Sequence, residues 1–469
     1  MSSSTAGVLC KDGNSDLTVS SSLIFPAAAP GVTTGAIYVE GLGNTVNIGS
    51  GVTISNTVNS GNVTTNAIFL GDYTVSRFSG SGTTTITGMS NVNTPAATGK
   101  NLSLVGTGAL TGFGFVGNNQ LILSKRDLSL AGITQASQLV GKTINMNGVV
   151  VDGEAGAGES RVITAYDPTT GVITVNRAWR GNQAGNGFNI IAGSGTNILT
   201  NAGTVSATYS GTTAAATSVR AIDTSVAGEY EINNTGTIRA EHTSIGTAQA
   251  IQAGGDVTSL TVNNAGTIEA VRTNGSLTLT TNIATALRAT GGGIANQTLG
   301  STAAIASQEE TETVSITNSL GGILRGIGDF SPAIYLRSEQ NSISNAGTIE
   351  GSKGGSFGRS ISGSTYGLAI VLSPDAGADE IRSTTINNSG TIRGDIVAAS
   401  ANGLRWYALS KFSTSAPGTA LDYSLAEAGD ATALGLVNAS TAARLSISNQ
   451  FGQGDSIIRN SGSILGDLY

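Results

Sequence analysis

A seven-residue phrase recurs seven times between residue 199 and the end of this chain of 469 residues. It reads apolar residue, any residue, Asn, any residue, Gly, Thr or Ser, apolar residue, and the copy at Asn318 has one extra residue before its glycine. The asparagines of the copies are Asn201, Asn234, Asn264, Asn318, Asn345, Asn388 and Asn460. The first copies lie about 30 residues apart, a period that is typical of stacked solenoid folds.

The chemistry of the phrase predicts a strand, a turn and a second strand. Glycine supplies a backbone with positive φ, and asparagine bonds its own backbone in turns. A turn at the same place in every unit lets the strands pair with the units above and below as parallel sheets. The asparagine side chains then form a structural ladder with a spacing of about 4.8 Å, in which each amide bonds the next.

A second phrase, Ala followed by a large apolar residue, recurs between copies of the first, as at Ala221-Ile222. Strand alternation directs Ile222, Ile238, Ile251 and Ile268 to one face, which predicts a continuous apolar core. The two phrases together predict an all-β chain folded as a parallel β-helix. At about 25–30 residues per rung, the roughly 400 residues outside insertions would form about 14 rungs.

The middle of the chain lacks both phrases. Segments 161–166 (RVITAY) and 172–175 (VITV) flank Asp-Pro-Thr-Thr-Gly, a pattern that predicts a β-hairpin. We therefore expect an inserted small β-domain. The predicted division is 1–124 for N-terminal β-helix rungs, 125–192 for the insert, and 193–469 for further rungs with loop excursions at 290–313, 351–366 and 397–455.

Composition excludes several classes of protein. Charged residues make up 11% of the chain, against about 25% in typical globular proteins. The net charge is −7 and basic residues are scattered, so no nucleic-acid partner is expected. A single cysteine, Cys10, excludes an intrachain disulfide framework. No apolar stretch is long enough to predict a transmembrane helix, and no signal peptide is visible. The chain is therefore expected to be either an intracellular protein or a mature fragment of an exported one, and its composition favours the fragment.

The phrases INNSGTIRGDI (386–396) and IRNSGSILGDL (458–468) resemble the passenger domains of autotransporters from Gram-negative bacteria. The resemblance covers 20–124 loosely and 193–469 well. It implies a right-handed parallel β-helix at the cell surface or outside the cell, and a C-terminal outer-membrane barrel that is missing from this chain. The phrase RVITAYDPTTGVITVNRAW of the insert resembles small β-modules of bacteriophage structural proteins.

The residues that could carry catalysis are few. His242 is the chain's one histidine, so neither a Ser-His-Asp site nor a usual zinc cluster is expected, and it should lie in an exposed turn. Glycoside hydrolysis needs two carboxyl groups about 5–10 Å apart. The acidic residues gather in segments expected to be solvated loops, namely Asp152, Glu154, Glu159, Glu309, Glu310, Glu312, Asp375, Asp379 and Glu380.

Two further sets of residues are candidates for binding. Asp395 and Asp467 hold equivalent Gly-Asp-apolar positions and could bind calcium, although capping a turn is the alternative, and no other cofactor is expected. Aromatic faces stack on sugar rings and arginine bonds acidic glycans. This pattern occurs at Tyr166, Arg177, Trp179, Arg180, Arg405, Trp406 and Tyr407. The alternative is that both tryptophans fill small cores.

These observations lead to three functional hypotheses. The first is a non-enzymatic surface passenger for adhesion or self-association, whose partner is another copy or a surface glycan or protein receptor. The second is a subunit of a surface array or filament. The third is a polysaccharide-cleaving enzyme or a relative of phage tail spikes, which requires a carboxylate pair along one face of the helix.

Overall fold

A computed structural model of the chain provides the coordinates. The residues that it describes are 6–10, 13–25, 34–58, 64–72, 118–123, 133–147, 150–151, 154–155, 159–179, 187–190, 195–211, 218–224, 227–243, 247–254, 256–273, 302–307, 311–328, 331–351, 368–372, 383–398, 456–466 and 468.

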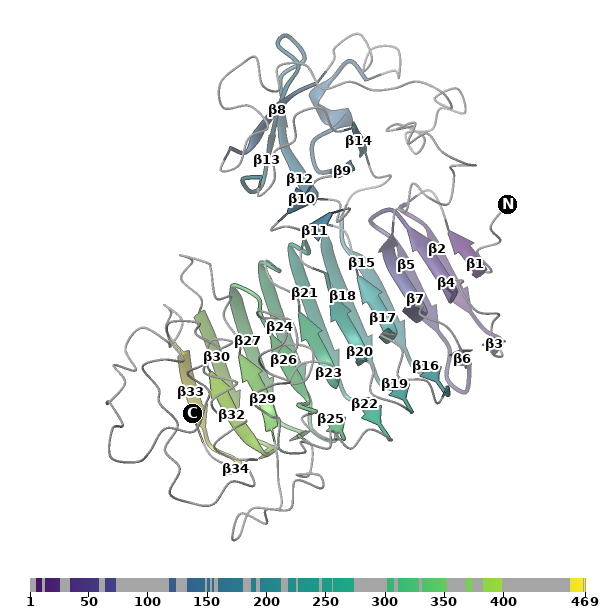
Figure 1. The fold of residues 1–469 in the computed structure, drawn as a ribbon, viewed down its shortest axis with the longest axis vertical. Helices are drawn as coiled ribbons and strands as arrows, with labels where there is room; N and C mark the ends of the chain where they lie inside the picture. Colours follow the sequence, from purple (N-terminus) through teal and green to yellow (C-terminus); the bar gives the residue numbers. More distant parts are fainter. Residues whose placement is uncertain are drawn as a thin grey trace, which may run out of the picture.

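Three parallel sheets of nine strands each form the body of the molecule (Figure 1). Sheet A contains, in spatial order, β1 (Ala6–Cys10), β4 (Thr34–Glu40), β7 (Thr64–Asp72), β17 (Ser218–Thr224), β20 (Thr247–Ala253), β23 (Thr302–Ser307), β26 (Ile334–Leu336), β29 (Leu368–Leu372) and β32 (Asp395–Ala398).

Sheets B and C run in the same rung order. Sheet B contains β2 (Asp16–Val19), β5 (Thr45–Ile48), β15 (Asn197–Asn201), β18 (Glu229–Asn234), β21 (Ser259–Asn264), β24 (Thr313–Asn318), β27 (Gln340–Asn345), β30 (Ser383–Asn388) and β33 (Ser456–Asn460). Sheet C contains β3 (Leu23–Phe25), β6 (Thr53–Val58), β16 (Thr204–Tyr209), β19 (Thr237–His242), β22 (Thr267–Arg272), β25 (Ile323–Ile327), β28 (Thr348–Glu350), β31 (Thr391–Arg393) and β34 (Ser463–Leu465).

The chain passes through sheets A, B and C in turn, once per rung, and forms the predicted right-handed parallel β-helix. The described residues make nine rungs, so the estimate of about 14 is wrong. The reason is that the segments between strands consume more of the chain than a compact rung would. The predicted excursion 290–313 also contains β23, a strand of sheet A. No helix of the described residues is long and apolar enough to cross a membrane.

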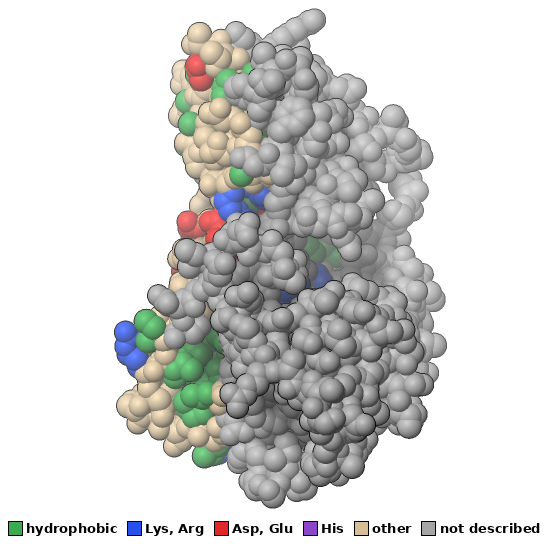
Figure 2. Space-filling model, turned by 60° about the vertical axis from the view of Figure 1, so that its left-hand side comes forward, with side chains coloured by type: hydrophobic (Ala, Val, Ile, Leu, Met, Phe, Trp, Pro, Cys, Tyr) green, Lys and Arg blue, Asp and Glu red, His purple; other side chains and the backbone are tan. Residues whose placement is uncertain are grey.

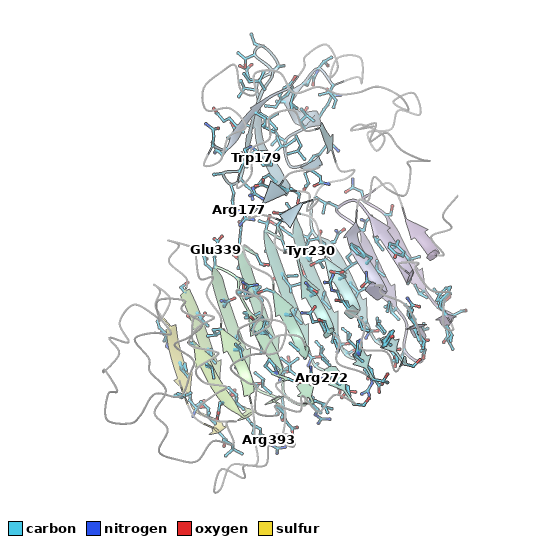
Figure 3. All side chains as sticks on the ribbon, in the orientation of Figure 1. Arg177, Trp179, Tyr230, Arg272, Glu339 and Arg393 are labelled. Carbon is cyan, nitrogen blue, oxygen red and sulfur yellow. The ribbon has the colours of Figure 1, made fainter. Side chains whose placement is uncertain are left out.

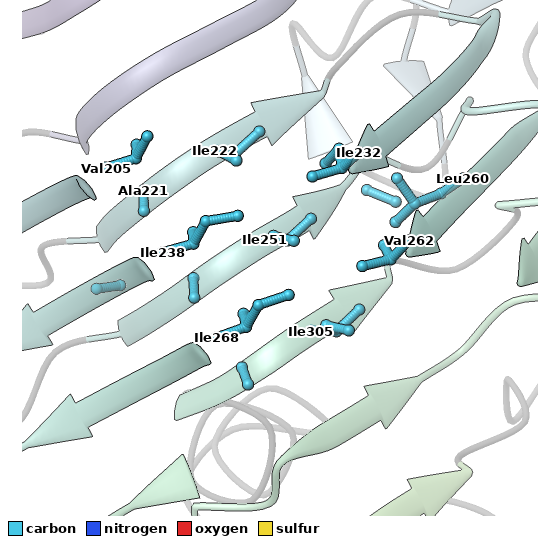
Figure 4. Close-up of a cluster of buried hydrophobic side chains, with 14 of the residues drawn as sticks. Val205, Ala221, Ile222, Ile232, Ile238, Ile251, Leu260, Val262, Ile268 and Ile305 are labelled. Carbon is cyan, nitrogen blue, oxygen red and sulfur yellow. The ribbon is translucent and has the colours of Figure 1, made fainter. Parts of the chain in front are cut away.

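The apolar core runs along the axis of the helix (Figure 4). Ile222, Ile238, Ile251 and Ile268 are all fully buried, which confirms the predicted face. Each buried side chain of this size stabilises the fold by about 1.5–3 kcal/mol. In strands such as β16 and β18, buried and half-exposed residues alternate, as period-two side-chain directions require.

The turn between sheets B and C explains the asparagine of the repeated phrase. Asn201 Nδ2 donates to Asn234 Oδ1 at 2.8 Å, and Asn234 Nδ2 donates to Asn264 Oδ1 at 2.8 Å. The same donation continues to Asn318, Asn345, Asn388 and Asn460. Within one turn, Asn201 Oδ1 accepts from the N–H of Gly203 at 3.1 Å. Each amide therefore closes its own turn and links two rungs.

The glycine of the phrase is needed for close packing between rungs and not for the predicted positive φ. Gly203, Gly236 and Gly266 do not adopt the positive φ expected of a turn glycine. Instead, a Cβ at Gly236 would lie 2.0 Å from the carbonyl oxygen of Gly203 in the rung below. The stacked turns are so close that no side chain fits between them. In the copy at Asn318 the matched glycine is Gly322, and Gly321, which belongs to the longer turn of this copy, has φ of +85°.

The insert leaves the β-helix after β7 and returns at β15, where the third rung turns from sheet A to sheet B (Figure 1). Its five-stranded sheet has the order β14 (Gly187–Ile190), β9 (Thr143–Asn147), β12 (Glu159–Tyr166), β13 (Val172–Val175) and β8 (Gln120–Ile122). The short elements are β10 (Val150–Val151), β11 (Glu154–Ala155) and the 3-10 turn η2 (Ala136–Gln138).

The predicted hairpin is formed by β12 and β13, which pair antiparallel. The side chain of Asp167 accepts hydrogen bonds from the N–H of Thr169 and the hydroxyl of Thr170 in the turn between them. Strand β8 of this sheet precedes residue 125, the predicted start of the insert.

Candidate functional site

The insert rests on the corners where successive rungs turn from sheet A to sheet B. Thr143 Oγ1 donates to the carbonyl of Ala227 at 2.6 Å, and Ser160 Oγ accepts from the N–H of Ala227 at 2.8 Å. On the next rung, Asp256 Oδ2 accepts from the N–H of Ser160 at 2.9 Å. The two following corners carry Glu312 and Glu339. The insert thus spans four corners in a row.

A buried arginine anchors this contact. Arg161 on β12 is 1% exposed, and its Nη1 lies 2.8 Å from Asp256 Oδ1 while its Nη2 lies 2.6 Å from Glu159 Oε1. Its guanidinium also lies 5.6 Å from the ring centre of Trp179. Removing one partner of such a buried group leaves an uncompensated charge, a change that typically costs about 3–5 kcal/mol. The network therefore fixes the insert against the β-helix.

Beside this anchor, charged side chains reach the surface. Arg177, which follows β13, places its Nε 3.0 Å from Glu312 Oε1 and donates from Nη1 to Glu339 Oε1 at 3.2 Å. Asn176 Nδ2 donates to Glu312 Oε1 at 2.7 Å. Figure 3 shows Arg177 between the insert and Glu339, and Figure 2 shows acidic and basic side chains gathered between the two parts. We call Asn176, Arg177, Glu312 and Glu339 the junction cluster.

The β-helix places the two glutamates side by side. Glu312 precedes β24 and Glu339 precedes β27, and these strands pair in parallel with Thr313 opposite Gln340. Neighbouring strands lie about 4.8 Å apart. The side chains of Glu312 and Glu339 are 24% and 22% exposed, so both carboxylates are accessible from solvent.

The surroundings of Glu312 favour its protonated form. Burial raises the pKa of this carboxyl above its ordinary value, and the positive charges of Arg177 and Arg161 oppose the shift without cancelling it. Glu312 therefore holds its proton to a higher pH than an ordinary surface glutamate. A carboxyl group tuned in this direction can act as a proton donor.

The predicted aromatic residues occupy other positions than expected. Trp179 is 1% exposed and Tyr166 is 7% exposed, so neither offers a face to a ligand, and Trp179 packs in the insert against Arg161. For Trp179, the structure confirms the interpretation that the ring fills a small core of the insert, and excludes a sugar-binding face. Of the predicted binding residues, Arg177 lies in the junction cluster. Arg180, Arg405, Trp406 and Tyr407 lie outside the described residues.

Two other expectations are wrong. His242 does not lie in an exposed turn, because it ends β19, is fully buried, and stacks on Tyr209 with ring centres 4.6 Å apart. Glu159 is not a solvated loop residue, because it lies on β12 and is fully buried. The stacking partner of His242 comes from another rung, and the partner of Glu159 is Arg161 on the same strand, whose own burial depends on Asp256 of the β-helix.

Neither calcium candidate has a described coordination site. Asp395 begins β32 and is 4% exposed, whereas Asp467 lies outside the described residues. Among the residues that the structure describes, no group of three or more His, Cys, Asp or Glu side chains could hold a metal ion. Calcium binding stays a prediction.

Sequence reasoning missed Glu339, Asp256 and Asn176. Each of the two acids precedes a copy of the asparagine phrase at the A–B corner of its rung. Aligning the copies would have placed Glu312 and Glu339 on neighbouring rungs. Nothing in the sequence would have shown that Arg177 joins them, since it is separated from Glu339 by 162 residues.

Comparison with models of protein families finds no match, and comparison with curated proteins finds none either. Two solved structures are similar. The tailspike protein gp49 of Pseudomonas phage LKA1 shares 10% identity over 82% of this chain and 63% of its own, with a TM-score of 0.24. The gp54 tailspike of Acinetobacter baumannii bacteriophage AP22, in complex with capsular saccharide, shares 10% identity over 83% and 64%, with a TM-score of 0.20.

The chain spans less than two thirds of either tailspike. Both matches are phage tailspikes and neither is an autotransporter passenger, so the main hypothesis of a non-enzymatic passenger for adhesion or self-association is corrected. The tail-spike alternative accords better with the matches. Similarity at these scores carries no residue-level information, and the residues of this chain must supply it.

Proposed function

We propose that this chain binds a polysaccharide outside the cell or on a phage surface and hydrolyses its glycosidic bonds at the junction cluster. The observation that carries the proposal is the pair of accessible carboxylates, Glu312 and Glu339, on neighbouring rungs and in contact with one guanidinium. The capsular saccharide held by the AP22 tailspike belongs to the same class of ligand.

The spacing of the pair fits a mechanism that retains configuration. Retaining glycosidases hold two carboxyl groups about 5–5.5 Å apart, and matched positions on neighbouring parallel strands lie about 4.8 Å apart. In this mechanism, Glu312 protonates the glycosidic oxygen as the leaving group departs. Glu339 attacks the anomeric carbon and forms a glycosyl ester, which a water molecule then hydrolyses while Glu312 accepts its proton.

The neighbours of the pair have distinct roles. Asn176 donates to Glu312 and orients it, and its own Oδ1 accepts from the N–H of Val162 at 3.0 Å, which fixes the amide. Arg177 donates to Glu339 and contacts Glu312, and so keeps the two carboxylates together. Both residues belong to the insert. The insert therefore completes a site whose carboxylates come from the β-helix.

The test is a depolymerisation assay on the full chain with a panel of purified bacterial capsular polysaccharides, read as new reducing ends. Glu312→Gln and Glu339→Gln should each lower the cleavage rate by about 10²–10⁴-fold while binding persists, since each loses a group that acts on the reacting bond. Glu241→Gln is the matched control, because Glu241 is also 24% exposed and pairs with an arginine, Arg239. The proposal is refuted if the wild-type chain cleaves none of the polysaccharides in the panel. It is also refuted if Glu312→Gln and Glu339→Gln both cleave at the wild-type rate.

A further inference from the structure

A groove of about 610 Å³ lies over the turns between sheets B and C in the last four rungs. Its lining comes from the ends of β24, β27, β30 and β33 and from the turns that follow them. It is distinct from the junction cluster, which lies at the opposite ends of β24 and β27. Six residues of strand separate the two places, a length of about 20 Å.

The irregular copy of the asparagine phrase builds one wall of this groove. Its turn, Ser319 to Gly322, is two residues longer than the turn of the preceding rung, and Leu320 projects from it with 86% of its surface exposed. The positive φ of Gly321 permits this wider turn. The next turns place only the small residues Ala346 and Ser389 at the lining. A large apolar side chain thus stands at the end of a row of small ones.

The floor offers hydrogen-bonding groups that the protein itself does not use. Thr317, Ser344 and Asn387 follow one another in register on the outer face of sheet B, and their side chains find no hydrogen-bond partner among the described residues. In the two rungs before the groove the same row is paired internally, because Asn263 Nδ2 donates to Asn233 Oδ1 at 2.9 Å. Within the groove, the hydroxyl and amide groups of the row are available to a ligand.

The charge of the groove is positive. Arg459 continues the same row on β33, is exposed, and is the charged residue among the described residues that line the groove. A guanidinium presents a fork of donors that matches a carboxylate. Apolar surface, spare hydroxyl and amide groups, and one cation are the groups that bind a sugar ring bearing a carboxylate.

We infer that the groove binds acidic sugar residues of the polysaccharide, with the carboxylate on Arg459 and the apolar face of a ring against Leu320. The inference rests on the proposed function and specifies its substrate class as an acidic polysaccharide. The rung spacing of about 4.8 Å is close to the length of one sugar residue, so successive rungs can meet successive residues. A chain that continues across sheet B from the groove reaches the junction cluster.

The test measures apparent Kd values for immobilised capsular polysaccharides, half of them carrying uronic or other carboxylated sugars and half neutral. The protein is the full chain with Glu312→Gln, which prevents consumption of the probe. We expect binding to acidic members and none to neutral ones. Arg459→Gln should weaken binding about tenfold, the effect of losing one charge-assisted contact.

A matched pair of variants distinguishes the effect of a charge inside the groove from the effect of the same charge elsewhere on sheet B. Thr317→Asp places a negative charge inside the groove and should also weaken binding about tenfold. Thr200→Asp adds the same charge at an exposed position of the same row three rungs earlier, and should leave Kd within about twofold. Equal effects of the two variants, equal binding of neutral polysaccharides, or no binding to any acidic member would overturn the inference.

The two proposals can fail separately. Suppose that Arg459→Gln leaves binding unchanged while Glu312→Gln abolishes cleavage by the otherwise wild-type chain. The inference that the groove binds acidic sugars is then wrong, and the proposed hydrolytic function is retained. If Arg459→Gln loses binding but the wild-type chain cleaves no polysaccharide, the groove is retained as a binding site and the proposed hydrolytic function is wrong.

Discussion

Replacing Asn264 by alanine tests how much the asparagine ladder contributes to the cohesion of the rungs. Asn264 is 1% exposed. Its Nδ2 donates to Asn318 Oδ1 at 2.8 Å, and its Oδ1 accepts from Asn234 Nδ2 at 2.8 Å and from the N–H of Gly266 at 3.2 Å. Its Nδ2 also donates to the carbonyls of Gly266 at 3.1 Å and Ile323 at 3.3 Å, and the variant removes all of these contacts.

The loss in the free energy of unfolding depends on which hydrogen-bond partners of Asn264 find another partner in the variant. In the variant, Asn234 Nδ2 still donates hydrogen bonds to the carbonyls of Gly236 and Thr267. The N–H of Gly266 still donates to the carbonyl of Asn234. Asn318 Oδ1 loses its donor from Asn264, and leaving a buried acceptor unpaired costs about 1–3 kcal/mol. Adding about 0.5–1.5 kcal/mol for the net loss of the other bonds gives an expected destabilisation of about 1.5–4.5 kcal/mol.

The assay is urea unfolding of the full chain followed by far-UV circular dichroism. Asn263→Ala is the matched control, because Asn263 is the adjacent residue, faces outward, and makes its one side-chain bond to Asn233 at a half-exposed site. That variant should lose about 0.5 kcal/mol or less, as surface substitutions usually do. If the two variants unfold at the same urea concentration, the ladder does not hold the rungs together and the reasoning fails.

Three further predictions test the core, the turns and the junction cluster. Ile268→Asp should lose about 4 kcal/mol or more in thermal unfolding, because it puts an unpaired charge at a fully buried position, and wild-type stability would contradict the assigned register. Gly236→Ala should lose about 3 kcal/mol in the same assay, since its Cβ would lie 2.0 Å from the carbonyl oxygen of Gly203. Arg177→Met should move the alkaline limb of the cleavage pH profile to higher pH: burial already raises the pKa of Glu312, and removing the arginine removes a charge that opposes this shift. An unchanged or acid-shifted limb would contradict the role of Glu312 as proton donor.

The repeated phrase made the architecture predictable because it determines both a turn and the strands on either side of it. Ile238 and Ile268 are buried where alternation placed them, and the hairpin of the insert follows from its Asp-Pro-Thr-Thr-Gly turn. The number of rungs was not predictable in the same way. Length divided by a period assumes compact rungs, and this chain spends long segments between its strands.

The candidate site was harder to predict because its parts are distant in sequence. Glu312 was noted as one acid among several in a loop, and Glu339 was not singled out. Their chemistry depends on stacking, which puts them on neighbouring rungs, and on Arg177, which comes from the insert. Trp179 failed as a binding residue for a related reason, since the contact with Arg161 buries it.

The distribution of charge over the three sheets favours sheet B as the face for an acidic ligand. On the outer face of sheet C, Arg239, Glu269, Arg325 and Glu350 follow one another in register, so that neighbours have opposite charges, and each successive pair forms an ion pair. Such cross-strand pairs stabilise a sheet by about 0.2–1 kcal/mol each and leave little net field. On sheet B, Glu229 and Glu231 lie on β18, but from β21 to β33 the described strand side chains are neutral except for Arg459, whose charge no described carboxylate compensates. The sheet C row continues with Arg393 opposite Glu350, so an acidic polysaccharide meets alternating attraction and repulsion there, whereas at the groove on sheet B it meets attraction alone.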